Sequence, residues 1–456
     1  MLPQQILGAG LMPPAPRPCP VCGKPVMPDA FGFVECTSCG WGGSDDPLEA
    51  AKGPSRLLTG LDRRISLAQA QNDLARLANN RDKSLRLNPF YTLTLLLVST
   101  LIYLLVLGIF VGTVALIVWS ILDKAWLGLI IGVLLLALQM VALWEGRFAP
   151  KGIRVKRDRF PQIFAAIDDV SARTGLRHPS RVLLVPGTVF FVAQTHPLRR
   201  LFWRERTLGI GVGALPLMSD VEMKAIIAHE MAHYGRMRLA LHRYYAGAER
   251  GLAQIVRALQ DTISSESRAR NRYKRFYYYG GYRGNIATSM GCAVSLLIWI
   301  VTLPIQVVLG LFHLLLLHES RTAEYEADRV AVRAYGPEAL ANGLTSVMTA
   351  SNSLARGVVG GDNLYEALRK HYANLPPSAV AQLRAQSTRD FRSLEDTHPT
   401  TPDRIRAAFL VGAADPGRQD ESQPAVQLIV PAGESDASAI ERQLSAMLRG
   451  GTRRRR

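Results

Sequence analysis

The sequence predicts a mainly α-helical α+β fold that combines a small mixed sheet with a hairpin of two transmembrane helices and a cysteine-rich module. Three observations lead to this prediction. Four cysteines lie in two Cys-x-x-Cys pairs near the N-terminus, two long uncharged runs follow, and the remainder mixes short apolar strands with longer helical patterns. At 456 residues, the chain is long enough for several domains.

Changes in composition divide the chain into five segments. They are a Pro-rich N-terminus with the cysteine module (1–45), a linker helix (46–88), a transmembrane hairpin (89–146), a main domain with a membrane-associated apolar segment at 285–317 (147–410), and a C-terminal tail (411–456). The linker is expected to be helical because apolar residues recur at roughly helical spacing among many charges in 61–87.

The cysteine module has the ligand spacing of a structural zinc site. Cys19 and Cys22 form one pair, Cys36 and Cys39 form the other, and a glycine follows each pair. Glycine allows the tight turn that points backbone amides at the thiolates. Two disulfides would be the alternative, but they are rare in the cytoplasm, where the charge pattern places this segment. We therefore predict a zinc ribbon stabilised by its metal ion.

Two uncharged runs, 90–122 and 125–144, are each long enough to cross a bilayer as a helix. They predict a hairpin that turns at Asp123 and Lys124. The net charge is +17, and basic residues crowd the outer ends of the runs rather than the turn. Because positive charge marks the cytoplasmic side, we expect a multi-pass protein of the cell (inner) membrane with a cytoplasmic N-terminus and main domain. The pattern favours contact with membrane lipid, and no nucleic-acid partner is expected.

The first part of the main domain predicts a helix, three strands and a well-marked second helix. The first helix is expected over 160–174, and the strands over 181–185, from Thr188, and from Thr207 to about residue 215. Ser219 and Glu222 then form a Ser-x-x-Glu capping box, which predicts the start of the second helix.

This helix carries the motif His-Glu-Met-Ala-His at 229–233. His229 and His233 are four residues apart, so they lie one turn apart on the same face. Two imidazole ligands with a carboxylate base between them are the pattern of zinc hydrolases, in which the base would be Glu230. The alternative is a surface helix that happens to carry two histidines.

A catalytic zinc ion needs a third protein ligand, and the sequence offers several carboxylates for it. Glu324 and Asp328 are also four residues apart, so one can bind zinc while the other holds the far N–H of a ligand histidine. Glu319 and Glu326 compete for these roles, and spacing alone does not choose among the four.

With these motifs, the chain resembles the membrane zinc metallopeptidases of the HtpX and CAAX prenyl protease type over roughly residues 150–410. The resemblance implies a gluzincin-type domain with Glu324 as the third ligand and Asp328 beside it. It also implies that His398 and Arg404, from a later His-Pro…Arg motif, act in catalysis by binding the substrate backbone or stabilising the oxyanion. The chain departs from the family in two respects: the zinc ribbon is an addition, and 190–193 lacks the asparagine usual on the edge strand.

The uncharged run 285–317 raises a topological constraint. A single crossing would separate His229 from Glu324, and 33 residues are too few for two crossings. We therefore expect a re-entrant hairpin bent at Pro304, or a kinked helix buried against the protein and the membrane interface.

Together, these features predict a membrane-anchored zinc endopeptidase that cleaves membrane-associated or misfolded proteins with a zinc-bound water activated by Glu230. Its cofactors would be one catalytic and one structural Zn²⁺, and its partners protein or peptide substrates, lipid, and an unknown partner of the ribbon. The alternative is a catalytically silent adaptor that binds partners through the ribbon.

Overall fold

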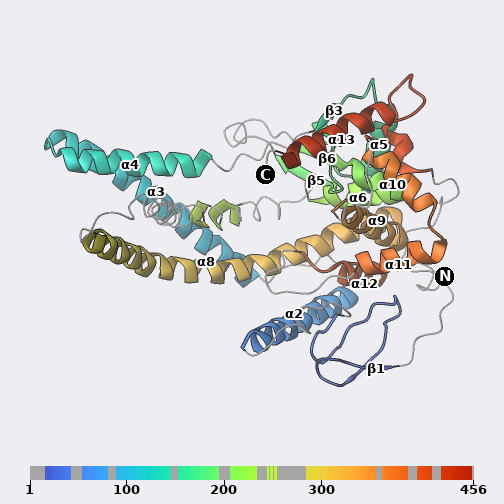
Figure 1. The fold of residues 1–456 in the computed structure, drawn as a ribbon, viewed down its shortest axis with the longest axis horizontal. Helices are drawn as coiled ribbons and strands as arrows, with labels where there is room; N and C mark the ends of the chain where they lie inside the picture. Colours follow the sequence, from blue (N-terminus) through green and yellow to red (C-terminus); the bar gives the residue numbers. More distant parts are fainter. Residues whose placement is uncertain are drawn as a thin grey trace. The chain divides into compact units, whose positions relative to one another are not determined.

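The computed structural model describes residues 16–42, 54–80, 89–144, 152–194, 206–233, 244–245, 247–249, 251–253, 284–355, 362–388, 398–412 and 423–453. The chain forms two units. The first comprises Met1–Arg86, Ala149–Leu239 and Ser320–Arg456, and the second comprises Leu87–Phe148 and Ala240–Glu319. The described residues are mainly helical with a small mixed sheet, so the predicted fold class is confirmed (Figure 1).

In the first unit, helices pack around a four-stranded sheet. Its strands are β3 (Ile153–Val155), β4 (Arg181–Val185), β5 (Phe191–Gln194) and β6 (Arg206–Gly211). Its helices include α2 (Pro54–Asn79), α5 (Pro161–Thr174), α6 (Asp220–Ala232), α9 (Pro337–Ala355), α10 (Leu364–Ala373), α11 (Pro377–Ser387), α12 (Thr401–Val411) and α13 (Ser438–Arg453). The strand order is β3-β4-β6-β5, with β4 and β6 parallel and the outer strands antiparallel to their neighbours.

The two central strands are almost wholly apolar because both of their faces are covered. Val182 is in register with Leu208, and Leu184 with Ile210. All four side chains belong to one core that also takes residues from α5, α6 and α9. Parallel strands buried on both faces need such continuous apolar sequence, so the sheet gives α6 a rigid support.

Helix α6 approaches α9 through a close backbone contact. A Cβ at Gly343 of α9 would lie 2.9 Å from Ile226 Cγ1 and 3.1 Å from the Glu222 carbonyl oxygen. Glycine is therefore the residue that fits there without a shift of α6. On the same helix, Ile227 and Met231 are fully buried in the core.

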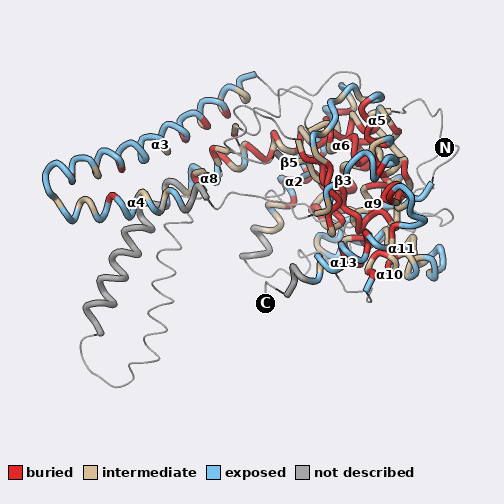
Figure 2. Tube along the Cα trace, turned by 90° about the horizontal axis from the view of Figure 1, so that it is seen from above, coloured by how far each residue is buried: buried red, intermediate tan, exposed pale blue. Residues whose placement is uncertain are grey.

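The second unit contains the predicted hairpin, formed by α3 (Pro89–Leu122) and α4 (Trp126–Trp144). Gln139 Nε2 of α4 donates a 2.8 Å hydrogen bond to Thr113 Oγ1 of α3. Most of the large apolar side chains of the two helices are exposed (Figure 2). Among the described residues, α3 is the helix whose length and hydropathy suit a membrane crossing, and Trp126–Ala137 is a shorter apolar stretch.

The apolar run 285–317 does not form a re-entrant hairpin. It belongs to α8 (Gly284–Tyr335), which is one continuous helix through Pro304. A proline inside a helix removes one backbone hydrogen bond and tends to kink the helix, but it does not by itself reverse the chain. The hairpin was expected because the run is too short for two crossings and because one crossing would separate His229 from Glu324. Its residues also belong to the second unit rather than to the main domain.

Two further segments differ from the sequence-based expectation. The strand expected to reach residue 215 ends at Gly211, and the 3₁₀ helix η3 (Val212–Leu217) follows it. The segment expected to be a C-terminal tail contains η4 (Ala425–Ile429) and α13, and it places Ile429 and Leu444 in the main core. Its charge and length suggested a tail, but α13 has one strongly apolar face that is buried.

The cysteine module forms a small two-stranded ribbon of β1 (Arg17–Pro18) and β2 (Pro25–Val26). The two Cys-x-x-Cys turns are alike. Gly23 N–H donates to the Cys19 carbonyl at 2.8 Å, Gly40 N–H donates to the Cys36 carbonyl at 2.8 Å, and both glycines have positive φ.

Candidate active site

The capping box fixes the residue at which α6 begins, and therefore the face of the helix on which its histidines lie. Glu222 N–H donates to Ser219 Oγ at 3.3 Å, and Ser219 N–H donates to Glu222 Oε2 at 3.0 Å. His229 lies within the helix and His233 is its C-cap residue, still with helical dihedrals. The capping box was predicted from sequence and is confirmed.

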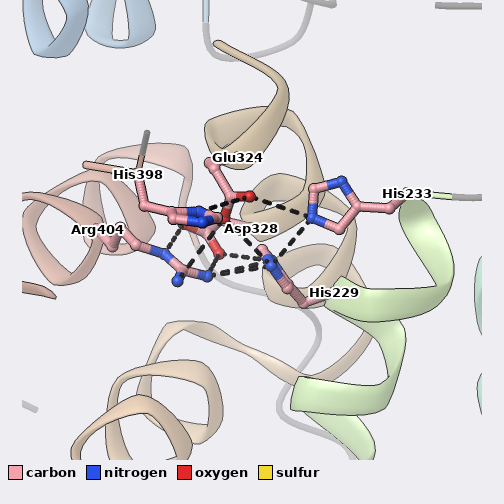
Figure 3. A network of polar contacts seen from close by, with 6 residues as sticks. All are labelled: His229, His233, Glu324, Asp328, His398 and Arg404. Atoms are coloured by element: carbon pink, nitrogen blue, oxygen red, sulfur yellow. Dashed lines mark hydrogen bonds and ion pairs between the residues drawn. The ribbon is translucent and has the colours of Figure 1, made fainter. Parts of the chain in front are cut away.

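His229 and His233 meet Glu324 of α8 at a common point (Figure 3). The two Nε2 atoms are 3.3 Å apart, His229 Nε2 is 3.4 Å from Glu324 Oε2, and His233 Nε2 is 3.4 Å from Glu324 Oε1. A tetrahedral zinc ion with bonds of about 2.0–2.1 Å has ligand atoms about 3.3–3.4 Å apart. The three residues could therefore hold a metal ion with little movement. Glu319 and Glu326 are not part of this group among the described residues.

Asp328 and Arg404 brace His229 on the side away from His233 (Figure 3). His229 Nδ1 lies 2.9 Å from Asp328 Oδ1, and Arg404 donates to both oxygens of Asp328, at 2.6 and 2.9 Å. A proton on Nδ1 shared with Asp328 leaves the lone pair of Nε2 for a metal ion. Asp328 is only 2% exposed. Although burial alone would raise its pKa, Arg404 and His229 hold the pKa of this carboxyl below its ordinary value.

The pKa values of Glu324 and His229 are shifted in the directions that keep both groups charged. Burial would raise the pKa of Glu324, but hydrogen bonds from His229, His233 and His398 lower it well below its ordinary value. Burial and the charge of Arg404 lower the pKa of His229, but Asp328 and Glu324 outweigh them and bring it to about 9. A metal ion bound here would have to displace a proton, so its affinity should fall with acidity.

Glu230 and His398 are the remaining predicted catalytic residues. Glu230 follows His229 on α6 and is partly exposed, and desolvation of its carboxyl raises its pKa. His398 precedes α12, and its Nδ1 lies 3.0 Å from Glu324 Oε1 while its side chain is 64% exposed. The hydrogen bond with Glu324 raises the pKa of His398.

The four cysteines form a second candidate metal site. Their sulfur atoms all lie within 4.8 Å of one another, and those of Cys19–Cys39 and Cys22–Cys36 are 3.6 and 3.5 Å apart. These distances exceed the roughly 2.05 Å of a disulfide and are close to the roughly 3.8 Å edge of a tetrahedral zinc–thiolate site. The backbone N–H of Lys24 lowers the pKa of Cys22 to about 7. The ribbon could thus hold a metal ion.

Comparison with known proteins decides the family. The family model described as "Peptidase family M48" matches residues 171–409, just over half of the chain. The chain belongs to peptidase family M48. The matched region contains both histidines of the candidate metal site, Glu324, Asp328 and Arg404. The M48 peptidases are zinc-dependent, so this chain is a metallopeptidase, and the predicted resemblance is confirmed.

Several M48 relatives carry the description "Protease HtpX homolog". The relative from Acaryochloris marina is 26% identical over 61% of this chain and 83% of its own length. Those from Pyrobaculum islandicum and Burkholderia mallei are 24% and 25% identical over 54% and 57% of this chain, and over 66% and 76% of their own lengths. No solved structure matches the chain significantly.

Sequence reasoning missed the ion pair between Arg404 and Asp328. The resemblance assigned Arg404 to the substrate or the oxyanion, and that role stays a prediction; in the structure the guanidinium group pairs with Asp328 and is 13% exposed. A local signal was present, because Thr400 and Asp403 form a Thr-x-x-Asp cap for α12 that fixes where Arg404 lies on its helix. The partner of Arg404 lies 76 residues away in sequence and left no such signal.

Proposed function

We propose that this M48 metallopeptidase is a membrane-anchored endopeptidase that uses Glu230 as its proton carrier and His229, His233 and Glu324 as its zinc ligands. The observation that carries the proposal is the meeting of three ligand atoms from α6 and α8 at tetrahedral spacing. Zinc bound there would act as a Lewis acid that polarises a carbonyl and makes water nucleophilic at neutral pH.

The residues around the ligands have separate tasks in this proposal. Glu230 takes a proton from the attacking water and returns it to the leaving amine, and its raised pKa brings it closer to neutral pH. His398 is exposed beside Glu324 and would contact the substrate carbonyl. Arg404 and Asp328 hold the orientation and tautomer of His229.

Strand β5 offers a place for an extended substrate. It forms the edge of the described sheet, pairs antiparallel with β6, and packs near α6. An extended peptide can add to such an edge through main-chain hydrogen bonds, which depend little on side-chain identity. This mode suits an enzyme that cleaves many misfolded or membrane-associated proteins, and it does not depend on the asparagine that the family resemblance leads us to expect at 190–193.

The remaining parts of the proposal concern the membrane and the ribbon. The exposed apolar surfaces of α3 and α4 suit lipid, and the basic flanks suit a cytoplasmic site on a multi-pass protein. The Cys₄ ribbon would hold a structural zinc ion.

Replacement of Glu230 by glutamine tests the mechanism. The variant should keep its zinc, measured by mass spectrometry of the detergent-purified protein, and lose casein cleavage by about 100-fold or more, the usual scale of general acid–base catalysis. His229→Ala should lose one zinc ion as well. Full activity in Glu230→Gln would overturn the mechanism, and an inactive wild type with a loaded metal site would favour the adaptor.

The substrates can be identified in cells. Newly formed protein N-termini should appear in cells with wild-type protein and be absent with Glu230→Gln at equal abundance. The proposal requires these N-termini to come mainly from membrane-associated or misfolded proteins, and N-termini confined to soluble, folded proteins would contradict it.

A further inference from the structure

Helix α12 lies between the metal ligands and the zinc ribbon within the first unit. Arg404 and Arg406 are two residues apart on this helix, so their side chains leave it in nearly opposite directions. Arg404 binds Asp328, which holds His229. Arg406 instead reaches Asp29 and Glu35 of the ribbon, at 2.7 and 3.4 Å.

The ribbon presents Asp29 to Arg406 from a tight turn. Asp29 Oδ1 accepts hydrogen bonds from the backbone N–H groups of Phe31 and Phe33, both at 2.9 Å. Its other oxygen, Oδ2, accepts from Arg406 Nε. One oxygen therefore builds the turn and the other joins the ribbon to α12.

Apolar contacts reinforce this junction. The guanidinium group of Arg406 lies over the ring of Phe33, 5.5 Å from its centre. The rings of Phe31 and Phe409 are 5.1 Å apart. The ribbon thus touches two successive turns of the outer face of α12, which fixes the rotation of the helix as well as its position.

Arg406 also connects to the first turn of α12. Its NH1 donates to Asp403 Oδ1 at 3.0 Å, while Asp403 Oδ2 accepts from Thr400 Oγ1 at 2.8 Å. Asp403 is 1% exposed. The chain of contacts from Asp29 to the cap of α12 is therefore short and partly buried, and Arg404 is the residue next to Asp403.

We propose that the zinc ribbon is a positioning module for the catalytic centre, and that Arg406 is the positioning residue that transmits its effect to Arg404. The inference rests on the proposed role of Arg404 in holding Asp328 and His229. An isolated helix of the length of α12 is marginal in water, so tertiary contacts set its orientation. A displacement of about 1 Å near reacting groups can cost about 100-fold in rate, so a small rotation of α12 would be felt.

Asp29→Asn is the decisive variant because it keeps the acceptor that builds the turn and replaces the oxygen that faces Arg406. It should lower kcat for a fluorogenic peptide about fivefold and change KM less than twofold, with zinc content unchanged. Arg406→Gln should lower kcat similarly. The double variant should lose no more than Arg406→Gln alone, since both changes break one junction. The proposal would be overturned if the fold-losses in kcat of the two single variants multiplied in the double variant. A kcat in Asp29→Asn within twofold of wild type would also overturn it.

Asp168→Asn is the matched control, because Asp168 also pairs with an arginine, Arg157, at 2.7 and 2.8 Å but belongs to α5. It should leave kcat unchanged, and a loss equal to that of Asp29→Asn would refute the specific role of the ribbon.

Hydrogen exchange separates this inference from the proposed function. Backbone amides of α12 should exchange faster in full-length Asp29→Asn than in wild type, while those of α6 stay protected. Unchanged exchange in α12 would refute the junction whatever the activity. Faster exchange in α12 of a protein without peptidase activity would uphold the junction and reject the proposed function.

Discussion

Replacement of Asp328 by asparagine tests whether the brace behind His229 is needed for the metal ion. The carboxylate receives three hydrogen bonds, one from His229 Nδ1 at 2.9 Å and two from Arg404 at 2.6 and 2.9 Å. It is buried, so water cannot replace a lost partner. Asparagine has the same shape but only one acceptor oxygen.

Neither orientation of the new amide satisfies all three donors. With its oxygen at the Oδ1 position, the NH₂ group faces Arg404 Nε, and this N–H loses its acceptor. With its oxygen at the Oδ2 position, the NH₂ group faces His229 Nδ1, and the proton of the ring must move to Nε2, the atom that faces Glu324. Each loss of a hydrogen bond to a charged group costs about 1.5–3 kcal/mol.

We therefore expect the affinity for catalytic zinc to fall about 10- to 100-fold, the usual effect of losing a carboxylate behind a ligand histidine. The assay is peptide cleavage in a series of chelator-buffered zinc concentrations, which yields the zinc concentration for half-maximal activity. Glu326→Gln is the control, because Glu326 is a buried carboxylate on the same helix, 3.5 Å from Arg329, outside the ligand group. Wild-type zinc dependence in Asp328→Asn, or an equal loss in Glu326→Gln, would refute this account of the brace.

Two further predictions concern the support of α6. Burial raises the pKa of Glu222 above its ordinary value of 4.5. The folded state therefore binds this proton more tightly than the unfolded state does. As a result, the free energy of unfolding should fall as pH rises from about 4.5 through the raised pKa. Glu222→Gln keeps an acceptor for the cap and should remove this contribution, which thermal unfolding across pH would show as a flatter slope; an unchanged slope would contradict it. Gly343→Ala should lower the unfolding temperature, because the added Cβ would lie 2.9 Å from Ile226. Replacing a glycine inside a helix by alanine usually has the opposite effect and stabilises the protein by about 0.5–1 kcal/mol. Overpacking costs about 1–3 kcal/mol, and a rise in the unfolding temperature would show that α6 and α9 are not in tight contact.

Local patterns made much of the fold and the site predictable. The capping box at Ser219, the bounds of β4 and the end of α5 before Gly175 each depend on neighbouring residues, and the structure confirms them. The spacing of His229 and His233 is also local, since a helix alone determines which face they share. Sequence could therefore predict the donor types and half of the geometry of the candidate metal site.

Non-local packing decided the features that sequence reasoning missed. Spacing alone left Glu324, Glu319 and Glu326 open, because the choice depends on which face of α8 meets α6, and Glu324 was chosen only through the family resemblance. The burial of Leu444 on α13 depends on a core built mainly from earlier residues. The partners of Arg404 and Arg406 lie 76 and 377 residues away, so no motif could reveal them.

The charges of the site explain how two carboxylates can be buried beside the ligand histidines. Glu324 and Asp328 stay ionised despite burial, and Arg404 and a protonated His229 balance them, which avoids the cost of two unpaired buried carboxylates. Because Asp328 lies against Nδ1 and Glu324 faces Nε2, a metal ion held by Nε2 would leave the contact between His229 and Asp328 intact. The two carboxylates therefore hold the geometry of the candidate metal site, which should weaken in acid as they become protonated.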